Sequence, residues 1–334
     1  MSDDKYILIR FSSLGDVVLT TGLIYYLGKT LQKKVIVITK NKFSAVFDHN
    51  PYVQEIINLN DGTFRNLLTI RKKIIQEYKN IPILDLHCNL RSSLLKFLLP
   101  NHPKKNYIKL PWSRRIYLFS QGKIKSNKLH LSVPERYALS YFNLQTLPPK
   151  EMLRPKLFLS KEEISWGSTY LNDLGLGKQK FVAIHPYASF TNKTWPKEQW
   201  RTYIHLLEKY NIPYVVLGRS KSPLLPHCAQ DLTNKTDLRQ TMAILALSHL
   251  VLSTDSGPLH LGWGLNKPLL GLFGPSDRAW GFFPYGENVQ IVQKPVPCRP
   301  CSLHGQNNCK YNNQCLTQIT PKEILSLTRR YFCS

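Results

Sequence analysis

The sequence predicts an α/β protein with two successive units, each containing a mostly parallel sheet. Short apolar, β-branched runs alternate with helical stretches in both halves of the chain, which is typical of the crossover units of parallel sheets. The length of 334 residues exceeds what one hydrophobic core usually holds. A proline-rich stretch at residues 143–160 separates the halves, as a linker would. We therefore expect two sheets that face each other across a cleft.

The first half contains four apolar runs with the length of buried strands and two stretches with helical periodicity. The expected strands are residues 6–11, 35–39, 56–59 and 81–86, and the expected helices are residues 17–31 and 64–78. The second helix is basic and amphipathic, so one of its faces should pack against the sheet.

The second half repeats this alternation after a capping box at residues 160–163, Ser-Lys-Glu-Glu. The expected strands are residues 181–185, 212–217, 250–253 and 269–273, and the expected helices are residues 197–210, 238–247 and 258–265. Another capping box, at residues 320–323, has Pro321 at the first helical position. We expect an N-terminal domain of residues 1–158 and a C-terminal domain of residues 159–334, with the last helix a candidate to pack back on the first domain.

The charge is strongly positive, with 45 Lys and Arg against 21 Asp and Glu and a formal net charge of +24. No acidic residue occurs between Asp85 and Glu135, whereas ten basic residues and five aromatic residues do. Such a tract is either a solvated basic face or a surface for an anionic partner, such as nucleic acid, lipid headgroups or a phosphorylated ligand. The unbroken excess of positive charge favours an anionic partner.

Composition and terminal sequence exclude several classes of protein. A hydrophobic fraction of 43%, with 14 Phe and 17 Tyr, is too high for a disordered chain. No run of 18 apolar residues predicts a membrane span. The first five residues, Met-Ser-Asp-Asp-Lys, lack the features of a secretory signal or transit peptide, so we expect a cytoplasmic protein.

Asp16 is the last residue of a short loop, Ser-Ser-Leu-Gly-Asp, between the first expected strand and the first expected helix. Ligands of open α/β sheets bind at this edge. The loop is neither a dinucleotide fingerprint nor a P-loop, because Gly15 is its one glycine and no Gly-Lys-Ser/Thr follows. Asp16 is therefore either a helix N-cap or a general base that accepts a proton from an attacking hydroxyl.

A polar loop follows the first strand of the second half. Ser189, Thr191 and Lys193 lie on this loop, just before a helix with Pro196 near its start. Two hydroxyls and an ammonium group suit an anionic ligand, although the same residues also occur in ordinary turns and caps. Gly218 and Arg219 end the next strand and are placed to contribute to the same edge.

The strongest single motif is Thr-Asp-Ser-Gly-Pro-Leu-His at residues 254–260, where a buried strand ends in small polar residues. Gly257 permits close backbone approach, and Pro258 sets the first turn of the following helix. The free amides and dipole of that turn favour a diphosphate. His260 lies about one turn inside the helix, either as a core histidine or as a group facing the same ligand. The turn at residues 274–277, Gly-Pro-Ser-Asp, is a second candidate rim of the site.

Four of these motifs together resemble the ADP-heptose:lipopolysaccharide heptosyltransferases of glycosyltransferase family 9. They are Ser-Leu-Gly-Asp (13–16), Lys-Thr-Trp-Pro (193–196), Thr-Asp-Ser-Gly-Pro-Leu-His (254–260) and Phe-Gly-Pro-Ser-Asp (273–277). They occur in the order of the family, and the resemblance runs from residue 7 to about residue 316. It implies the GT-B type of fold, with two Rossmann-like domains facing across a cleft. It also implies an inverting glycosyltransferase that moves heptose from ADP-heptose to the inner core of lipopolysaccharide.

The resemblance also implies roles for individual residues. Asp16 matches the family's proposed base, and no cofactor is required for catalysis. The candidate substrate-binding residues are Ser189, Thr191, Lys193, Gly218, Arg219, Thr254, Asp255, Ser256, Gly257 and His260 for the donor, and Arg91, Arg114 and Arg115 for a phosphate or Kdo carboxylate of the acceptor. The expected partners are the ADP-heptose donor, a lipid-anchored anionic saccharide and the inner face of the cytoplasmic membrane, without nucleic acid.

Four of the seven cysteines cluster near the C-terminus, and Cys88, Cys228 and Cys333 are scattered. The cluster consists of Cys298, Cys301, Cys309 and Cys315. Four thiolates can hold a structural zinc ion, but these spacings are not those of paired zinc knuckles. Reduced thiols and a disulfide are the alternatives, and a cytoplasmic location favours reduced thiols.

Two other functions stay open from the sequence. A few residues in a cleft decide the donor, so the same fold could transfer another sugar. The basic tract could instead bind nucleic acid, although the sequence has no RNP motif, zinc finger or helix-turn-helix pattern.

Overall fold

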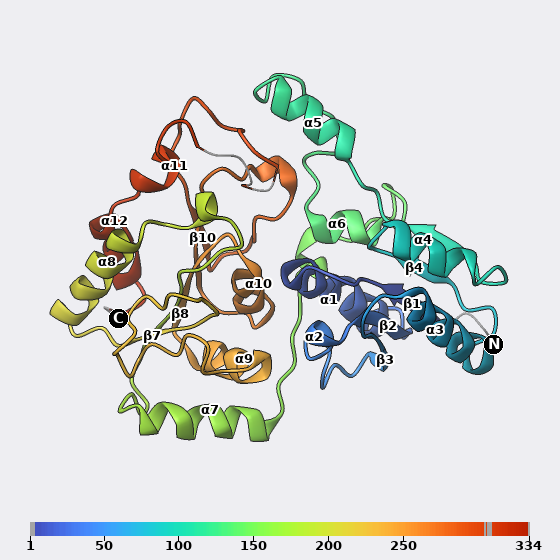
Figure 1. Ribbon diagram of the computed structural model, residues 1–334, viewed down its shortest axis with the longest axis horizontal. Helices are drawn as coiled ribbons and strands as arrows, with labels where there is room; N and C mark the ends of the chain where they lie inside the picture. Colours follow the sequence, from blue (N-terminus) through green and yellow to red (C-terminus); the bar gives the residue numbers. More distant parts are fainter. Residues whose placement is uncertain (1–3, 304, 306–308, 333–334) are drawn as a thin grey trace. The chain divides into compact units, whose positions relative to one another are not determined.

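The chain forms two compact units in the computed structural model, which describes residues 4–303, 305 and 309–332 (Figure 1). Unit 1 comprises Met1–Lys109 and Leu131–Phe158, and unit 2 comprises Leu110–His130 and Leu159–Ser334. Three of the five N-terminal residues on which the expected cytoplasmic location rests, residues 1–3, lie outside the described residues, as does Cys333. None of the helices in the described ranges is long and apolar enough to span a membrane.

Unit 1 is built on a five-stranded parallel sheet with the strand order β3-β2-β1-β4-β5. The strands are β1 (Lys5–Ile9), β2 (Lys34–Lys40), β3 (Val53–Leu59), β4 (Ile83–Asp85) and β5 (Lys104–Asn106). The helices are α1 (Leu14–Lys29), α2 (Asn41–Ser44), α3 (Phe64–Glu77), α4 (Leu90–Phe97) and α6 (Val133–Ala138), with a 3₁₀ turn η1 (Lys150–Leu153).

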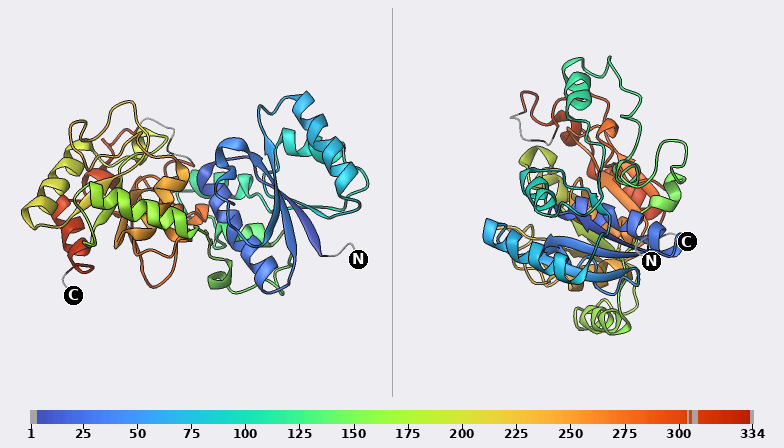
Figure 2. Two further views of the ribbon diagram at one scale, coloured as in Figure 1. Left: turned by 90° about the horizontal axis from the view of Figure 1, so that it is seen from below. Right: turned by 90° about the vertical axis from the view of Figure 1, so that its right-hand side faces the viewer.

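Alternation along the strands distributes the unit 1 core over both faces of the sheet. Ile7 and Ile9 pack with Ile70 and other apolar residues of α3 and α4. Leu8, which is also fully buried, points to the opposite face, where α1 lies (Figure 2). Because helices cover both faces of the sheet, the central strands have nearly continuous apolar sequences, and this pattern made them recognisable in the sequence.

Unit 2 contains a second five-stranded parallel sheet, with the order β10-β9-β8-β6-β7. Its strands are β6 (Val182–His185), β7 (Tyr214–Val216), β8 (Leu250–Thr254), β9 (Leu269–Leu272) and β10 (Val289–Val292). Its helices are α5 (Pro111–Phe119), α7 (Lys161–Asp173), α8 (Lys197–Lys209), α9 (Leu238–Leu247), α10 (Gly257–Gly264), α11 (Gln314–Thr317) and α12 (Pro321–Arg329), with 3₁₀ turns η2 (Thr191–Lys193) and η3 (Arg278–Trp280).

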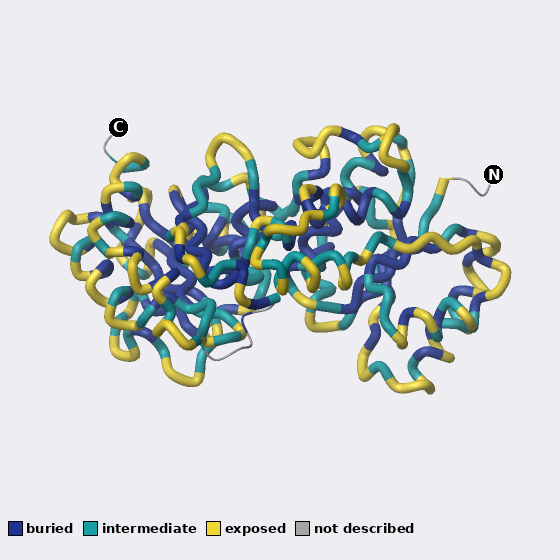
Figure 3. Tube along the Cα trace, turned by 90° about the horizontal axis from the view of Figure 1, so that it is seen from above, coloured by how far each residue is buried: buried dark blue, intermediate teal, exposed yellow. Residues whose placement is uncertain are grey.

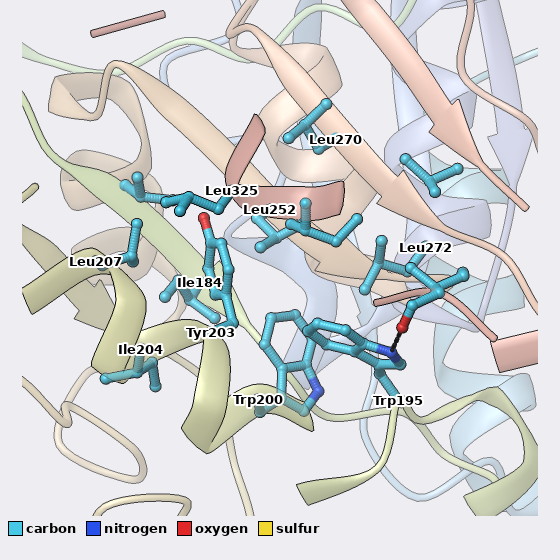
Figure 4. Packing of buried hydrophobic residues seen from close by; sticks show 14 of the residues in the cluster. Ile184, Trp195, Trp200, Tyr203, Ile204, Leu207, Leu252, Leu270, Leu272 and Leu325 are labelled. Atoms are coloured by element: carbon cyan, nitrogen blue, oxygen red, sulfur yellow. Dashed lines mark hydrogen bonds between the residues drawn. The ribbon is translucent and has the colours of Figure 1, made fainter. Parts of the chain in front are cut away.

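Aromatic side chains fill the core between the unit 2 sheet and helices α8 and α12 (Figure 4). The rings of Trp195 and Trp200 meet edge to face at 4.9 Å, and both side chains are fully buried. The indole of Trp195 donates a hydrogen bond of 3.0 Å to the carbonyl of Ile319. Tyr203 shares a hydrogen bond of 2.7 Å with Thr328 of α12. These contacts fix the loop before α8, which carries Lys193, against the sheet.

The last helix, α12, packs against α8 within unit 2, whereas the sequence suggested the first domain as its partner. Its apolar residues Ile324 and Leu325 belong to the unit 2 core. The capping boxes predicted at Ser160 and Thr320 are both present. The middle strands of both sheets are mostly buried, and Figure 3 shows buried stretches of the chain in dark blue with exposed turns in yellow.

The segment Leu110–His130 clusters with unit 2, although the sequence placed it in the N-terminal domain. Arg114 of α5 donates a hydrogen bond of 2.9 Å to the carbonyl of Trp280, and Tyr117 meets the Trp280 ring at 5.8 Å. Because these contacts join residues more than 160 positions apart, the local sequence carries no sign of them.

Candidate active site

The loop after β1 brings Asp16 to the carboxyl edge of the unit 1 sheet. β2 and β3 lie on one side of β1, and β4 and β5 on the other. Ligands of doubly wound sheets bind at such a switch point in strand order. Ser13 is the N-cap of α1, and Asp16 is the third residue of the helix and completes the capping box. The first alternative for Asp16, a helix N-cap, is therefore wrong.

Four donors surround the carboxylate of Asp16. Oδ1 accepts from the guanidinium of Arg10 at 2.7 Å and from the hydroxyl of Tyr137 at 3.0 Å. Oδ2 accepts from the hydroxyl of Ser13 at 2.7 Å and from its amide at 3.3 Å. Burial acts to raise the pKa of Asp16, but Arg10 and these hydrogen bonds outweigh it and lower the pKa. Asp16 is therefore ionised at neutral pH.

Arg10 joins the ends of β1 and β4. Its guanidinium also donates to the carbonyl of Leu86 at 2.5 Å and lies 5.5 Å from the centre of the Tyr137 ring. Tyr137 comes from α6, about 120 positions along the chain from Asp16. The sequence singled out neither Arg10 nor Tyr137, because their roles depend on contacts between distant segments.

A second polar cluster follows β4 at the same edge. Asp85 is fully buried, pairs with Lys96 at 2.7 Å and accepts the amides of His87 and Cys88. Burial, with the positive charge of Arg10 and Lys109, lowers the pKa of His87 to about 4, so its imidazole is neutral at pH 7. The sequence did not single out His87, although a histidine directly after a predicted strand was an available signal.

The switch point of the unit 2 sheet lies between β6 and β8. His185 ends β6, and the turn from Thr254 to Gly257 follows β8. Ser256 is the N-cap of α10, but its side chain does not cap the helix. It instead shares hydrogen bonds with Nδ1 of His185 at 3.2 Å and with Ser253 at 3.4 Å. Without a capping side chain, the start of α10 suits an anionic ligand.

Lys193 is held at this edge by Asp255. Its Nζ lies 2.6 Å from Oδ2 of Asp255, which also accepts from the hydroxyl of Ser276 at 2.5 Å. The side chain of Asp255 is buried, so its carboxylate needs these partners. Asp255 thus positions the ammonium group. Its carboxylate would repel a diphosphate, so we expect no direct contact between them.

Gly218 adopts a φ of +132°, and a Cβ built there would lie 2.6 Å from the ring of Tyr187 and 2.7 Å from His185. The glycine therefore allows both rings to approach the backbone. The hydroxyl of Tyr187 lies 2.8 Å from that of Thr233, and the hydroxyl of Thr254 donates to the carbonyl of Tyr187 at 2.9 Å. These contacts hold the turn after β7 against the loops that follow β6 and β8.

The remaining predicted donor residues differ in exposure. Ser189, Thr191 and Arg219 are exposed, whereas His260 is buried. The ring of His260 lies 6.3 Å from Trp263 and 6.4 Å from the ring of Phe282. This environment fits the core histidine that was one of the two alternatives.

The three predicted acceptor arginines are not grouped within one unit. Arg91 is exposed on α4 of unit 1, and its side chain lies against Gly62. Arg114 is tied to Trp280 in unit 2 and also faces the ring of Phe282 at 5.8 Å. Arg115 is exposed.

The four clustered cysteines line one cavity of about 240 Å³. Sγ of Cys309 accepts the amides of Tyr311 at 3.4 Å and Asn313 at 3.2 Å. The six cysteines within the described residues are free thiols, so the disulfide alternative is wrong for them. Within residues 4–303, 305 and 309–332, no group of three metal-ligating side chains is placed to hold a metal ion.

The fold of this protein is similar to those of solved bacterial glycosyltransferases. The structure of ADP-heptose LPS heptosyltransferase II from E. coli matches with a TM-score of 0.74 and 20% identity over 98% of each chain. E. coli heptosyltransferase WaaC, solved with ADP-2-deoxy-2-fluoro heptose, matches with a TM-score of 0.62 and 19% identity over 98% of this chain and 99% of the other. The fold is thus of the GT-B type, with two Rossmann-like units, as the sequence predicted.

The sequence comparisons agree with this class of protein. Lipopolysaccharide heptosyltransferase 1 of Campylobacter coli is 22% identical over 98% of this chain and 99% of its own length. The model of glycosyltransferase family 9 (heptosyltransferase) matches residues 69–312. The chain belongs to glycosyltransferase family 9, which confirms the resemblance seen in the motifs.

Proposed function

We propose that this protein transfers heptose from ADP-heptose to the inner core of lipopolysaccharide, with inversion at the anomeric carbon. The observation that carries the proposal is that Lys193 and the uncapped start of α10 lie together at the switch point of the unit 2 sheet, an arrangement suited to an anion. Family membership and relatives named as heptosyltransferases support the choice of sugar.

The donor would bind with its diphosphate at the edge of unit 2. Lys193, oriented by Asp255, and the first amides of α10 are suited to receive the negative charge that grows on the departing diphosphate. The hydroxyls of Ser189 and Thr191 are exposed on the same loop and would add donors. Gly218 allows the rings of Tyr187 and His185 to pack against the backbone at this edge, beside which the nucleoside would lie. These groups supply the charge stabilisation without a cofactor.

Asp16 would act as the general base. Since four donors occupy its carboxylate, one of them must give way before it accepts a proton from the acceptor hydroxyl. Ser13 is exposed, so its hydroxyl is the donor that an incoming sugar hydroxyl would replace. Arg10 and Tyr137 would keep the carboxylate oriented during the reaction.

The acceptor is proposed to be an anionic saccharide anchored in lipid, which the protein reaches from the inner face of the cytoplasmic membrane. The stretch between Asp85 and Glu135, which lacks acidic residues, suits a phosphorylated acceptor and an anionic leaflet. Arg91, Arg114 and Arg115 stay candidates for contacts with the acceptor. A nucleic acid is not part of this proposal.

We also propose a structural zinc ion at the clustered cysteines, whose side chains would have to draw together on binding it, because no three of them in the described residues are placed around a common ion. The support is that the four thiols line one cavity and that two amides point at Sγ of Cys309, as they do toward thiolate ligands. Metal analysis of the purified protein should give about one zinc per chain, lost in Cys301→Ser and retained in the control Cys228→Ser. A metal-free wild-type protein would leave reduced thiols as the remaining alternative.

Incubation with ADP-heptose and core acceptors of graded truncation, followed by mass spectrometry, tests the proposed reaction. We expect one acceptor of the series to gain a single heptose. Transfer from another sugar nucleotide instead would keep the enzyme class and reject the donor. Thermal shifts distinguish the proposed enzyme from a nucleic-acid-binding protein. ADP but not UDP should raise the melting temperature of the enzyme, whereas a nucleic-acid-binding protein should respond to neither nucleotide.

A further inference from the structure

Helix α5 of unit 2 carries large apolar side chains that are exposed to solvent. Trp112 is 69% exposed, Ile116 47% and Phe119 82%, and no residue of α5 is buried. Ile124, just beyond the helix, is 61% exposed. Large side chains grouped in this way mark an interaction surface, whereas single exposed apolar residues do not.

Helical geometry shows that these residues share one side of α5. At about 100° per residue, Trp112, Arg115, Ile116 and Phe119 fall within an arc of about 100°. Arg115 lies over the ring of Trp112 at 5.3 Å. The exposed face is thus a continuous stripe of two aromatic rings, one aliphatic side chain and one guanidinium group.

The opposite side of α5 anchors the helix to the body of unit 2. Arg114 bonds to the carbonyl of Trp280, and Tyr117 packs on the Trp280 ring. Both residues are only partly exposed, and they project about 140° or more away from Trp112. Since this contact fixes the orientation of α5, the apolar stripe faces away from the unit 2 core.

The charged residues that neighbour the stripe in the sequence are all basic. Lys123, Lys125 and Lys128 follow the helix and are exposed. No acidic residue occurs between Asp85 and Glu135. An apolar stripe rimmed by Lys and Arg, with a tryptophan on it, has the character of a helix that lies in the interface of an anionic membrane. A protein partner would instead need complementary acidic groups and a shaped surface.

We propose that α5 and the segment 120–128 form the surface by which this protein docks on an anionic phospholipid bilayer. Trp112, Ile116 and Phe119 would enter the headgroup region, and the lysines would face lipid phosphates. This inference deepens the proposed function, because it assigns the membrane contact to particular residues, but it does not depend on which sugar is transferred.

Co-sedimentation with phosphatidylcholine vesicles, with and without phosphatidylglycerol, tests the proposal. The double variant Trp112→Ser/Phe119→Ser should bind the anionic vesicles at least about tenfold more weakly than wild type, because two exposed aromatic groups are lost. Lys123→Glu/Lys125→Glu should show a similar loss at low salt and a smaller difference from wild type at high salt.

Matched variants away from α5 serve as controls. Phe64→Ser and Leu144→Ser remove side chains that are 55% and 59% exposed, and Lys178→Glu/Lys322→Glu changes two exposed lysines. These variants should bind vesicles like wild type. Unchanged binding by Trp112→Ser/Phe119→Ser would overturn the proposal, as would a wild type that ignores anionic vesicles. Self-association that this variant abolishes, without vesicle binding, would assign α5 to a protein interface and also overturn it.

A second assay separates this inference from the proposed reaction. Wild type and Trp112→Ser/Phe119→Ser should transfer sugar equally well to a deacylated, water-soluble core saccharide. On a lipid-anchored acceptor in vesicles, the variant should be at least about tenfold slower. If no acceptor is glycosylated by either protein, the proposed reaction fails, whereas the result on vesicle binding stands.

Discussion

Asp16 is the residue whose chemistry is most directly testable. Replacement by Asn keeps its shape but removes the proton acceptor, so kcat should fall by about 10²–10⁴-fold. The dissociation constant for ADP should stay within about twofold, because the donor groups lie in unit 2. Arg10 would lose its charged partner, so the free energy of unfolding should fall by about 2–4 kcal/mol. Steady-state kinetics, calorimetry with ADP and urea unfolding give the three quantities.

Asp173→Asn is the matched control, since Asp173 is exposed at the end of α7. It should change neither kcat nor stability. Wild-type turnover in Asp16→Asn would remove Asp16 from the proposed mechanism. A loss of ADP binding that matches the loss of kcat would assign it to the donor site instead.

His185 couples the donor site to acid stability. Burial lowers its pKa from 6.5 to about 4, so the folded protein binds fewer protons than the unfolded chain between these values. The contribution of His185 is fully present above pH 6.5 and declines as the pH falls toward 4. Between pH 7 and pH 4.5 it should amount to about 2–3 kcal/mol. Urea unfolding at both pH values should show a smaller decline for His185→Gln than for wild type.

Other groups also titrate over this range, so the informative quantity is the difference between two proteins. His205→Gln provides the comparison, because the side chain of His205 is 79% exposed. Its acid sensitivity should equal that of wild type. An equal decline in all three proteins would show that His185 does not titrate as its burial implies.

The sequence located the candidate ligand-binding groups of the site better than the side chains that contact them. Lys193 and Ser256 stood out because they lie in loops directly after predicted strands, where ligands of parallel sheets bind. Asp255, which orients Lys193, lies in a quoted motif, and His185, which contacts Ser256, ends an expected strand, but the sequence could not pair them. Pairing depends on which strands are neighbours in the sheet, and β6 and β8 are separated by about 65 residues.

The turn after β7 illustrates how one position constrains an element. Gly218→Ala would place a methyl group 2.6 Å from Tyr187, at a φ of +132° that side chains rarely adopt. We expect the free energy of unfolding to fall by about 2–4 kcal/mol, since steric overlap adds to backbone strain. Chemical denaturation measures this change.

Gly175→Ala is the control for backbone strain alone. Gly175 has a φ of +75°, and nothing lies within 4 Å of a Cβ placed there. Its substitution should cost about 1 kcal/mol. If the two variants lose equal stability, the close approach of Tyr187 and His185 to Gly218 contributes nothing.

Elements with strong apolar periodicity were predictable, and short polar elements were not. The helix expected at residues 238–247 coincides with α9, and the strand expected at residues 250–253 lies within β8. β5 (Lys104–Asn106) was missed because all three of its residues are exposed and polar. Its place in the sheet comes from pairing with β4, which no local pattern reveals. α5 was missed because its stripe of apolar residues lacks a buried partner.

The arrangement of both sheets concentrates ligand-binding loops at one edge of each unit. In each sheet, the first strand of the unit lies between strands that follow it in the chain, so the loops after neighbouring strands diverge there. The alternation of strands and helices made this architecture predictable from the sequence. The assignment of residues 110–130 to unit 2 was not, because it rests on a few contacts with Trp280 rather than on local composition.

If the donor site belongs to unit 2, ADP should protect that unit from hydrogen exchange in a defined pattern. The amides at the start of α10 and in the loop that carries Lys193 should slow by at least about tenfold at saturating ADP, because bound phosphate would hold them as acceptors do. The loop before α1 in unit 1, which carries Asp16, should not slow to the same extent. Mass spectrometry of peptides from both units measures this directly, with Lys193→Ala as the variant in which the protection should weaken. Protection confined to unit 1 would contradict the proposal that unit 2 binds the donor, since the residues that hold the diphosphate would then lie at the edge of the unit 1 sheet.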